Sequence, residues 1–178
     1  LARLKEDCGG FLFAVGDGNH SLATAKACWE ELKNQQGDAL PADHPARYAM
    51  VELVNLYDPA LVFEPIHRAL FGADPGELQA DFAAYCREGG MELAPCAPEE
   101  ADLFLDDAPC VIRNRENPLA VAVLQPFLDR WLAAHPECCL DYIHGRDALK
   151  RLDALGIRLT PMDKGTLFPS VRCGGPLP

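Results

Sequence analysis

The chain has 178 residues, of which 16 are Lys or Arg and 27 are Asp or Glu, so its formal net charge is −11 at pH 7. This length fits one domain with a sizeable core, and the ordinary mixture of apolar and charged residues argues against a disordered or collagen-like chain. The negative charge argues against a nucleic-acid partner, and no apolar run approaches the roughly 20 residues that a membrane-spanning helix needs.

The first part of the chain alternates apolar runs with turns that contain glycine, asparagine and proline. Short apolar runs bounded by such residues are typical of buried strands, whereas apolar residues at a spacing of 3.6 indicate a helix. A following glycine marks the end of a helix. On these grounds we expect strands at 10–15, 48–56 and 61–64, and helices at 20–35 and 65–71.

The same rules predict a mixture of helices and strands in the rest of the chain, without a strict βαβ alternation. We expect helices at 74–88, 127–134 and 147–155, and strands at 108–113, 119–124, 140–143 and 166–168. The fold class that follows is α/β or α+β, with a mixed sheet on which helices pack. We expect a single such domain over residues 1–178.

Both ends of the sequence look like the edges of a longer chain. The first residues, which lack a Met, resemble the end of an amphipathic helix that began earlier. The last five residues are rich in glycine and proline and complete no element. We therefore expect an incomplete part of a larger protein, truncated at both ends.

The eight cysteines form no Cys-x-x-Cys pair and no cluster with the spacing of a zinc finger. Several of them lie in apolar stretches, where free cysteine behaves as a small buried hydrophobe. Unpaired thiols are typical of a reducing compartment. We expect reduced cysteines and a cytoplasmic protein.

The most informative local feature is a glycine-rich turn between a predicted strand and a predicted helix, Gly16-Asp17-Gly18-Asn19-His20-Ser21. Glycine lets the backbone approach a ligand closely, and the first N–H groups of a helix form a ready anion site. Asp17, Asn19, His20 and Ser21 add a carboxylate, an amide, an imidazole and a hydroxyl. This set suits a phosphate or the polar head of an amino acid. The alternative is an Asp/Asn turn in which Asn19 or Ser21 caps the helix.

Two later junctions between predicted elements also carry histidine and arginine. At the first, His67 is a candidate acid or base, and Arg68 a candidate clamp for phosphate or carboxylate. At the second, Gly145 separates His144 from Arg146, which can pair with an anion. The alternative at the first junction is a first turn at the surface with ordinary charges. At the second junction, the alternative is that Asp147 simply favours the start of a helix.

Two polar residues, Glu52 and Asn55, interrupt the apolar stretch 48–56. Their side chains lie either on a solvated face or in a ligand site, and we keep both as candidate binding residues. No helix carries a His-x-x-x-His pair, so we assign no residue as a metal ligand.

Four segments in order resemble the domain of unknown function 1015, a family of bacteria and archaea: residues 13–26, 54–68, 141–145 and 162–169. Many members of this family read D-G-H-H-R where this chain has Asp17-Gly18-Asn19-His20-Ser21. That pattern is similar to the phosphate-binding loop of the sulfiredoxin and partition-protein superfamily, which includes kinases of free serine. Family members also tend to be encoded near enzymes of serine biosynthesis.

The resemblance and the residues together suggest part of an enzyme that handles a phosphorylated small molecule, such as serine or phosphoserine, with a nucleotide and Mg²⁺. Residues 17–21 would hold the phosphoryl group, with His20 as donor or acid–base and Asp17 as a base or metal-orienting carboxylate. His67, with Arg68 or Arg146, would clamp the charge. The alternative is a non-catalytic domain that binds a small molecule or phosphate. Partition-like DNA binding is disfavoured by the net charge.

Overall fold

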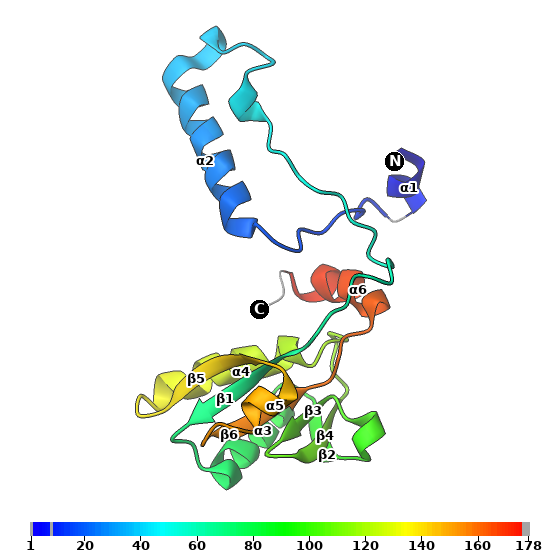
Figure 1. The fold of residues 1–178 in the computed structure, drawn as a ribbon, viewed down its shortest axis with the longest axis vertical. Helices are drawn as coiled ribbons and strands as arrows, with labels where there is room; N and C mark the ends of the chain where they lie inside the picture. Colours follow the sequence, from blue (N-terminus) through cyan, green and yellow to red (C-terminus); the bar gives the residue numbers. More distant parts are fainter. Residues whose placement is uncertain (1, 8, 176–178) are drawn as a thin grey trace. The chain divides into compact units, whose positions relative to one another are not determined.

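The computed structural model describes residues 2–7 and 9–175 (Figure 1). The chain divides into two compact units, Leu1–Asp58 and Pro59–Pro178, and each unit is described by itself. The single domain expected over residues 1–178 stays a prediction. None of the helices in the described residues combines the length and the apolar character needed to cross a bilayer.

The first unit is helical where it has regular structure. Its elements are α1 (Ala2–Asp7), α2 (Asn19–Gln36), and the 3-10 turns η1 (Gly37–Ala39) and η2 (Pro45–Arg47). Helix α2 confirms the predicted helix at 20–35. None of its residues is buried; Leu22, Trp29 and Leu32 on its apolar side are half-buried.

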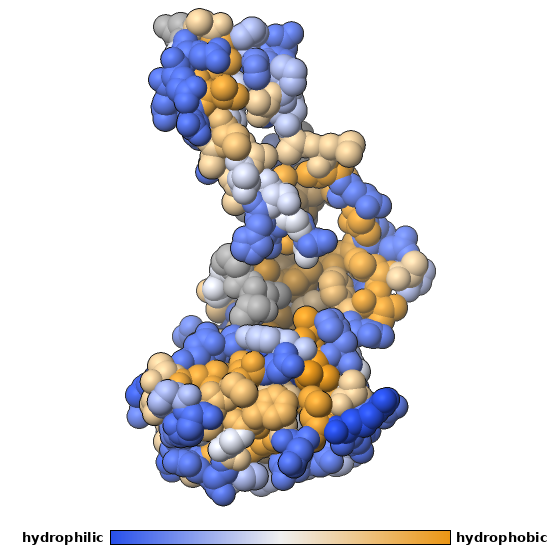
Figure 2. Space-filling model, turned by 60° about the vertical axis from the view of Figure 1, so that its left-hand side comes forward, coloured by the Kyte–Doolittle hydropathy of each residue, from blue (hydrophilic) through white to orange (hydrophobic). Residues whose placement is uncertain are grey.

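The strands predicted at 10–15 and 48–56 do not form in this unit. A strand requires a neighbour that completes its backbone hydrogen bonds, and neither stretch pairs with one in the described residues. Large apolar side chains in both stretches are exposed, among them Phe13, Val15, Met50 and Val54. Figure 2 shows apolar residues exposed beside hydrophilic ones on the molecular surface.

The second unit is built on a six-stranded sheet in which every neighbouring pair is antiparallel. The strand order is β2-β4-β3-β6-β1-β5. The strands are β1 (Ile66–Phe71), β2 (Glu92–Pro95), β3 (Leu103–Leu105), β4 (Ala108–Arg113), β5 (Cys139–His144) and β6 (Leu155–Leu159). The helices are α3 (Pro75–Glu88), α4 (Val121–Ala134), α5 (Arg146–Leu149) and α6 (Lys164–Gly174), with the 3-10 turn η3 (Pro98–Glu100).

The main core lies between one face of this sheet and the helices α3 and α4 (Figure 1). Side chains alternate between the two faces of a strand, so every second residue points into this core. Its fully buried members are Leu70, Leu78, Phe82, Leu103, Leu124, Leu128 and Ile157, among others. The predicted class, a sheet with helices packed on it, is confirmed; the sheet is antiparallel throughout rather than mixed.

The helix predicted at 65–71 is wrong, because residues 66–71 form β1, an interior strand that lies between β6 and β5. Its residues 67–70 are buried on both faces of the sheet, so the run does not alternate as a half-buried strand would. Proline is common at the first position of a helix, so Pro65 favours the wrong prediction of a helix here. The strand predicted just before it, at 61–64, does not form.

The strand predicted at 119–124 is also wrong, because residues 121–124 begin α4. Two valines favour a strand locally, but packing overrides this preference. Val123, Leu124, Phe127 and Leu128 of the helix are all buried in the core. The helix predicted at 127–134 is confirmed as the rest of α4.

Two further assignments need correction near the end of the chain. The helix predicted at 147–155 is reduced to α5, and Leu155 begins the strand β6. The strand predicted at 166–168 lies inside α6, whose start is capped by the Asp163 carboxylate as it accepts from the Gly165 N–H at 2.7 Å. The helix at 74–88 and the strands at 108–113 and 140–143 are confirmed as α3, β4 and β5.

The described cysteines carry free thiols, whereas Cys8 lies outside the described residues. Cys86 and Cys110 are buried in the core. Burial raises the pKa of Cys86 to about 11, so this thiol stays protonated at neutral pH. These two cysteines therefore behave as core residues.

Candidate functional site

The glycine-rich turn of the first unit leads directly into α2. Gly18 is the N-cap residue and adopts the left-handed conformation, with φ 77° and ψ 18°. L-residues with a side chain rarely adopt this conformation, which explains the need for glycine. The cap is therefore Gly18 and neither Asn19 nor Ser21, and no side chain caps the first N–H groups of the helix.

Residues 16–21 line a shallow hollow at this turn, and all of them are exposed. The Asp17 carboxylate accepts a hydrogen bond from the Gly18 N–H at 2.7 Å. The structure thus brings Asp17, Gly18, Asn19, His20 and Ser21 together, as the sequence predicts. Uncapped N–H groups at the start of a long helix favour an anionic group in such a hollow.

A second candidate site lies on the face of the sheet opposite α3 and α4. Strands β1 and β6 are antiparallel, and their register pairs Arg68 with Ile157. His67, which precedes Arg68, therefore lies beside Arg158, which follows Ile157. His67 is only 4% exposed. Its Nδ1 accepts a hydrogen bond from the Leu159 N–H at 3.3 Å. The neutral imidazole therefore carries its proton on Nε2, which can donate.

The surroundings of His67 are positively charged. Burial, and then the charges of Arg158, Arg68 and His144, lower the pKa of His67. Each of these effects disfavours a second proton on the ring. His67 is therefore a neutral hydrogen-bond donor at pH 7, held among cations.

The guanidinium of Arg158 lies over the ring of Phe104, with its Cζ 3.4 Å from the ring centroid. Burial and the charge of Arg146 lower the pKa of Arg158, although Asp107 acts in the opposite direction. Its Nε is buried and has no hydrogen-bond partner within residues 2–7 and 9–175. This guanidinium has donor capacity that the surrounding protein does not use.

His144 and Arg146 lie at the same end of the sheet. His144 ends β5 and pairs with Ile66, so the alternation of side chains places it on the face of Arg68, at the strand end next to His67. Its charge still acts on His67. Arg146 is the first residue of α5, after the N-cap Gly145. Both side chains are exposed. We call His67, His144, Arg146 and Arg158 the cationic group.

Arg68 points to the opposite face and is held by protein groups. Its Nε donates to the Gln125 side chain at 3.0 Å, and its Nη1 donates to the Ile66 carbonyl at 2.5 Å. Its guanidinium also lies 4.5 Å from the centroid of the Tyr142 ring. Arg68 is only 3% exposed and links β1 to α4 and β5. We therefore leave it out of the cationic group.

The two polar residues of the stretch 48–56 lie in the first unit. Glu52 is exposed. The Asn55 side chain accepts from the Tyr57 N–H at 3.1 Å, which forms a local turn. Both residues belong to the first unit, whereas the cationic group belongs to the second.

Arg158 is the member of the cationic group that sequence reasoning missed. It lies in β6, and the sequence predicts no element over residues 156–159 of this strand. The signal was present, because Leu155, Ile157 and Leu159 alternate with a period of two, and this pattern places Arg158 on the other face of a strand.

The chain was compared with known proteins in three ways. Neither the curated proteins nor the solved structures gave a match. The family model described as "Protein of unknown function (DUF1015)" matches residues 1–138. Because this match covers well over half of the sequence, the chain belongs to the DUF1015 family.

Proposed function

We propose that this chain binds an anionic small molecule, of the phosphate-ester class, at the cationic group. The observation that carries this proposal is the buried, neutral His67 beside Arg158 and other cations. Positive charges held close to one another and partly desolvated are costly. An anion bound at the cationic group would relieve the repulsion between its positive charges. It would also accept hydrogen bonds from His67 and Arg158.

A phosphate ester suits these donors better than a simple anion. A guanidinium presents N–H groups in a planar fork that matches phosphate oxygens, and His67 offers one further N–H on Nε2. His144 and Arg146 are exposed, so they can move toward a ligand that arrives from solvent.

A separate and narrower proposal concerns the glycine-rich turn of the first unit alone. It is phosphoryl transfer that involves serine or phosphoserine, as suggested by the resemblance of residues 17–21 to the loop of the free-serine kinases. In such a reaction, the γ-phosphoryl group of a nucleoside triphosphate passes to the serine hydroxyl. The hydroxyl proton goes to a base such as His20 or Asp17, and the nucleoside diphosphate leaves. Mg²⁺ would neutralise the charge of the phosphates.

The alternative function, a non-catalytic binding domain, is favoured by one observation. The Nδ1 lone pair of His67 is already used by the Leu159 N–H, so His67 serves more readily as a donor than as a base. A turnover assay with serine and ATP distinguishes the two functions. Phosphoserine formation that His20→Ala abolishes favours the enzyme, whereas ligand binding without turnover favours the binding domain.

The binding proposal is tested by thermal unfolding of the chain with phosphoserine, inorganic phosphate, serine or ATP, each with and without Mg²⁺. A ligand at 100 times its Kd stabilises the native state by about 2.7 kcal/mol, which raises the Tm of a chain of this size by roughly 5–10 °C. We expect this shift with phosphoserine or ATP, and binding at least tenfold weaker in Arg158→Gln.

The matched control is Arg130→Gln, which removes the same charge from an exposed arginine that pairs with Glu88 at 3.3 Å. This variant should keep the full shift. Equal shifts in the two variants, or no shift with any phosphorylated ligand, would contradict the proposal.

A further inference from the structure

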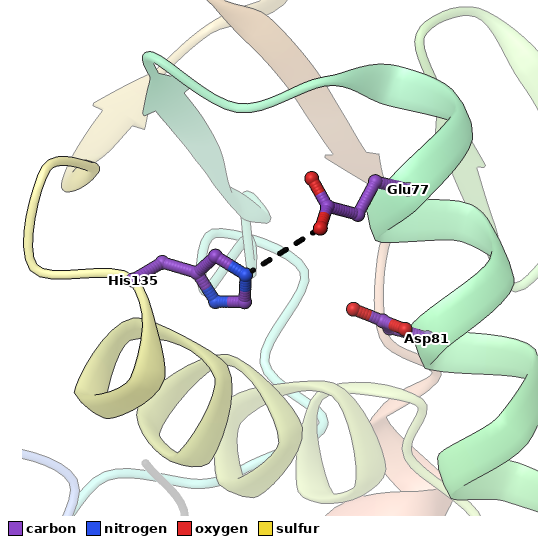
Figure 3. A group of neighbouring side chains, drawn as sticks. All are labelled: Glu77, Asp81 and His135. Atoms are coloured by element: carbon purple, nitrogen blue, oxygen red, sulfur yellow. Dashed lines mark ion pairs between the residues drawn. The ribbon is translucent and has the colours of Figure 1, made fainter.

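Three side chains that can each supply a metal-ligand atom converge between α3 and the end of α4. Glu77 and Asp81 are one turn apart on α3, and His135 is the C-cap residue of α4. Their ligand atoms all lie within 4.8 Å of one another. Figure 3 shows Glu77 and His135 pointing toward each other, with Asp81 one turn further along the same helix.

The separations are close to those of a coordinated ion. A tetrahedral site with bonds of about 2.0–2.2 Å holds its ligand atoms about 3.4 Å apart. Nε2 of His135 and Oε1 of Glu77 are 3.7 Å apart. Because the Glu77 side chain is 55% exposed, rotation of that side chain can close the remaining gap without moving the core.

Trp131 orients two of the three side chains. Nδ1 of His135 lies 2.8 Å from the Trp131 carbonyl oxygen, which can only accept a hydrogen bond. Nδ1 therefore carries the proton, and the lone pair of the neutral ring is on Nε2, the atom that faces Glu77. The two rings are also stacked, with centroids 3.8 Å apart.

The same tryptophan holds the Asp81 carboxylate. Its indole Nε1 donates to Oδ2 of Asp81 at 2.9 Å, and Oδ1 takes no part in this hydrogen bond. Trp131 is 5% exposed and belongs to the core. Histidine and carboxylate ligands of metal sites are commonly held by such outer hydrogen bonds, which fix their orientation.

The local charge favours a cation. The carboxylates of Glu77 and Asp81 place negative charge beside the His135 ring. A divalent ion bound among these three side chains would offset that charge.

We propose that Glu77, Asp81 and His135 bind one divalent transition-metal ion, with Trp131 as the positioning residue. One imidazole nitrogen and two carboxylate oxygens suit Zn²⁺ or Mn²⁺, whereas Ca²⁺ takes six to eight oxygens. Three protein ligands leave coordination positions open to water or to a small ligand, as in catalytic rather than structural zinc sites. This inference does not depend on the proposed phosphate-ester binding.

The test uses Mn²⁺ alone, because Mn²⁺ prefers carboxylates and is a poor partner for the free thiols of this chain. The chain has two tryptophans, so Trp29→Phe leaves Trp131 as the single fluorescent tryptophan. Bound Mn²⁺ is counted from the loss of the free-ion electron paramagnetic resonance signal at pH 8. We expect one equivalent to bind and to quench the fluorescence of Trp131.

Two variants, made in the Trp29→Phe background, test whether Mn²⁺ binds at these three side chains. Glu77→Gln removes a ligand from an exposed side chain and should weaken binding at least tenfold while the circular dichroism spectrum stays unchanged. His135→Gln should do the same. Glu88→Gln is the matched control, because Glu88 lies on the same helix but pairs with Arg130; it should bind like the parent.

Three results would overturn the proposal: no binding at millimolar Mn²⁺, binding that Glu77→Gln leaves unchanged, or binding that does not quench Trp131. If His135→Gln does not fold, Glu77→Gln and Asp81→Asn test whether Mn²⁺ binds at this cluster.

Discussion

At the scale of single residues, the proposed binding site depends on His67 and Arg158. The β1–β6 register places these two residues side by side, although they are far apart in the sequence. The hydrogen bond from the Leu159 N–H fixes the tautomer of His67, and the close contact with the Phe104 ring holds the guanidinium of Arg158. The chemistry of the site therefore follows from strand pairing, which no local motif reveals.

The lowered pKa of His67 predicts a pH dependence of stability. In the unfolded chain the pKa returns to its ordinary value of 6.5, so just below that pH the unfolded chain binds more protons than the native one. The free energy of unfolding should therefore decrease as the pH falls below about 6.5. Replacing His67 by Gln should remove this part of the decrease.

The measurement is denaturant unfolding of the second unit's tryptophan, in a Trp29→Phe background, at a series of pH values from neutral to acidic. The control is His20→Gln, which removes an exposed histidine from the first unit. If His67→Gln and His20→Gln had the same pH profile, the burial and charge assigned to His67 would be incorrect.

At the scale of elements, the sequence predicted those helices and strands whose local signals agree with their packing. Helix α3 starts at the Asp74 cap, whose carboxylate accepts from the Glu77 N–H at 2.8 Å, and ends before Gly89. Its buried residues Leu78, Phe82 and Cys86 recur at helical spacing. Caps, glycine and periodicity all indicate the same element here.

Prediction failed where packing overrides the local pattern. Strand β1 is buried on both faces and follows a proline, so its residues lack the alternation typical of a strand. The start of α4 contains two valines but is buried by the sheet. In both cases the deciding contacts come from distant parts of the chain, which periodicity does not describe.

The packing of α4 predicts a large loss of stability for Leu128→Ala. Leu128 is fully buried in the core between α4 and the sheet, where its removal leaves a cavity. We expect the free energy of unfolding to fall by about 2–5 kcal/mol. Arg130→Ala, on the exposed side of the same helix, should change it by no more than about 0.5 kcal/mol.

Denaturant unfolding curves of the two variants check this prediction. A decrease of less than about 1 kcal/mol for Leu128→Ala would mean that α4 does not pack as described.

At the scale of the whole molecule, the family resemblance and the fold class were predicted from the sequence and are confirmed. The loop at residues 16–21 was also predicted as a cluster, because its members are adjacent in the chain. The cationic group was predicted only in part: His67, His144 and Arg146 stood out as polar residues at junctions, whereas Arg158 required the strand order. The similarity to free-serine kinases stays a prediction.

The metal-ligand cluster escaped sequence analysis for the same reason. Glu77 and Asp81 show the spacing of one helical turn, but His135 joins them only because α3 and α4 pack side by side on the sheet. A pair of carboxylates one turn apart is common on exposed helices, so the spacing alone indicated no site.

The most direct test of the central claim is an NMR titration of the His67 imidazole in the chain, with and without phosphoserine. The chain has five histidines, and His67→Gln identifies the signal. Without ligand, the pKa of His67 should lie below its ordinary value of 6.5. With phosphoserine it should rise, because the bound phosphate offsets the charges of Arg158 and His144. A pKa that phosphoserine at saturating concentration leaves unchanged would contradict the proposal that the cationic group binds phosphate esters.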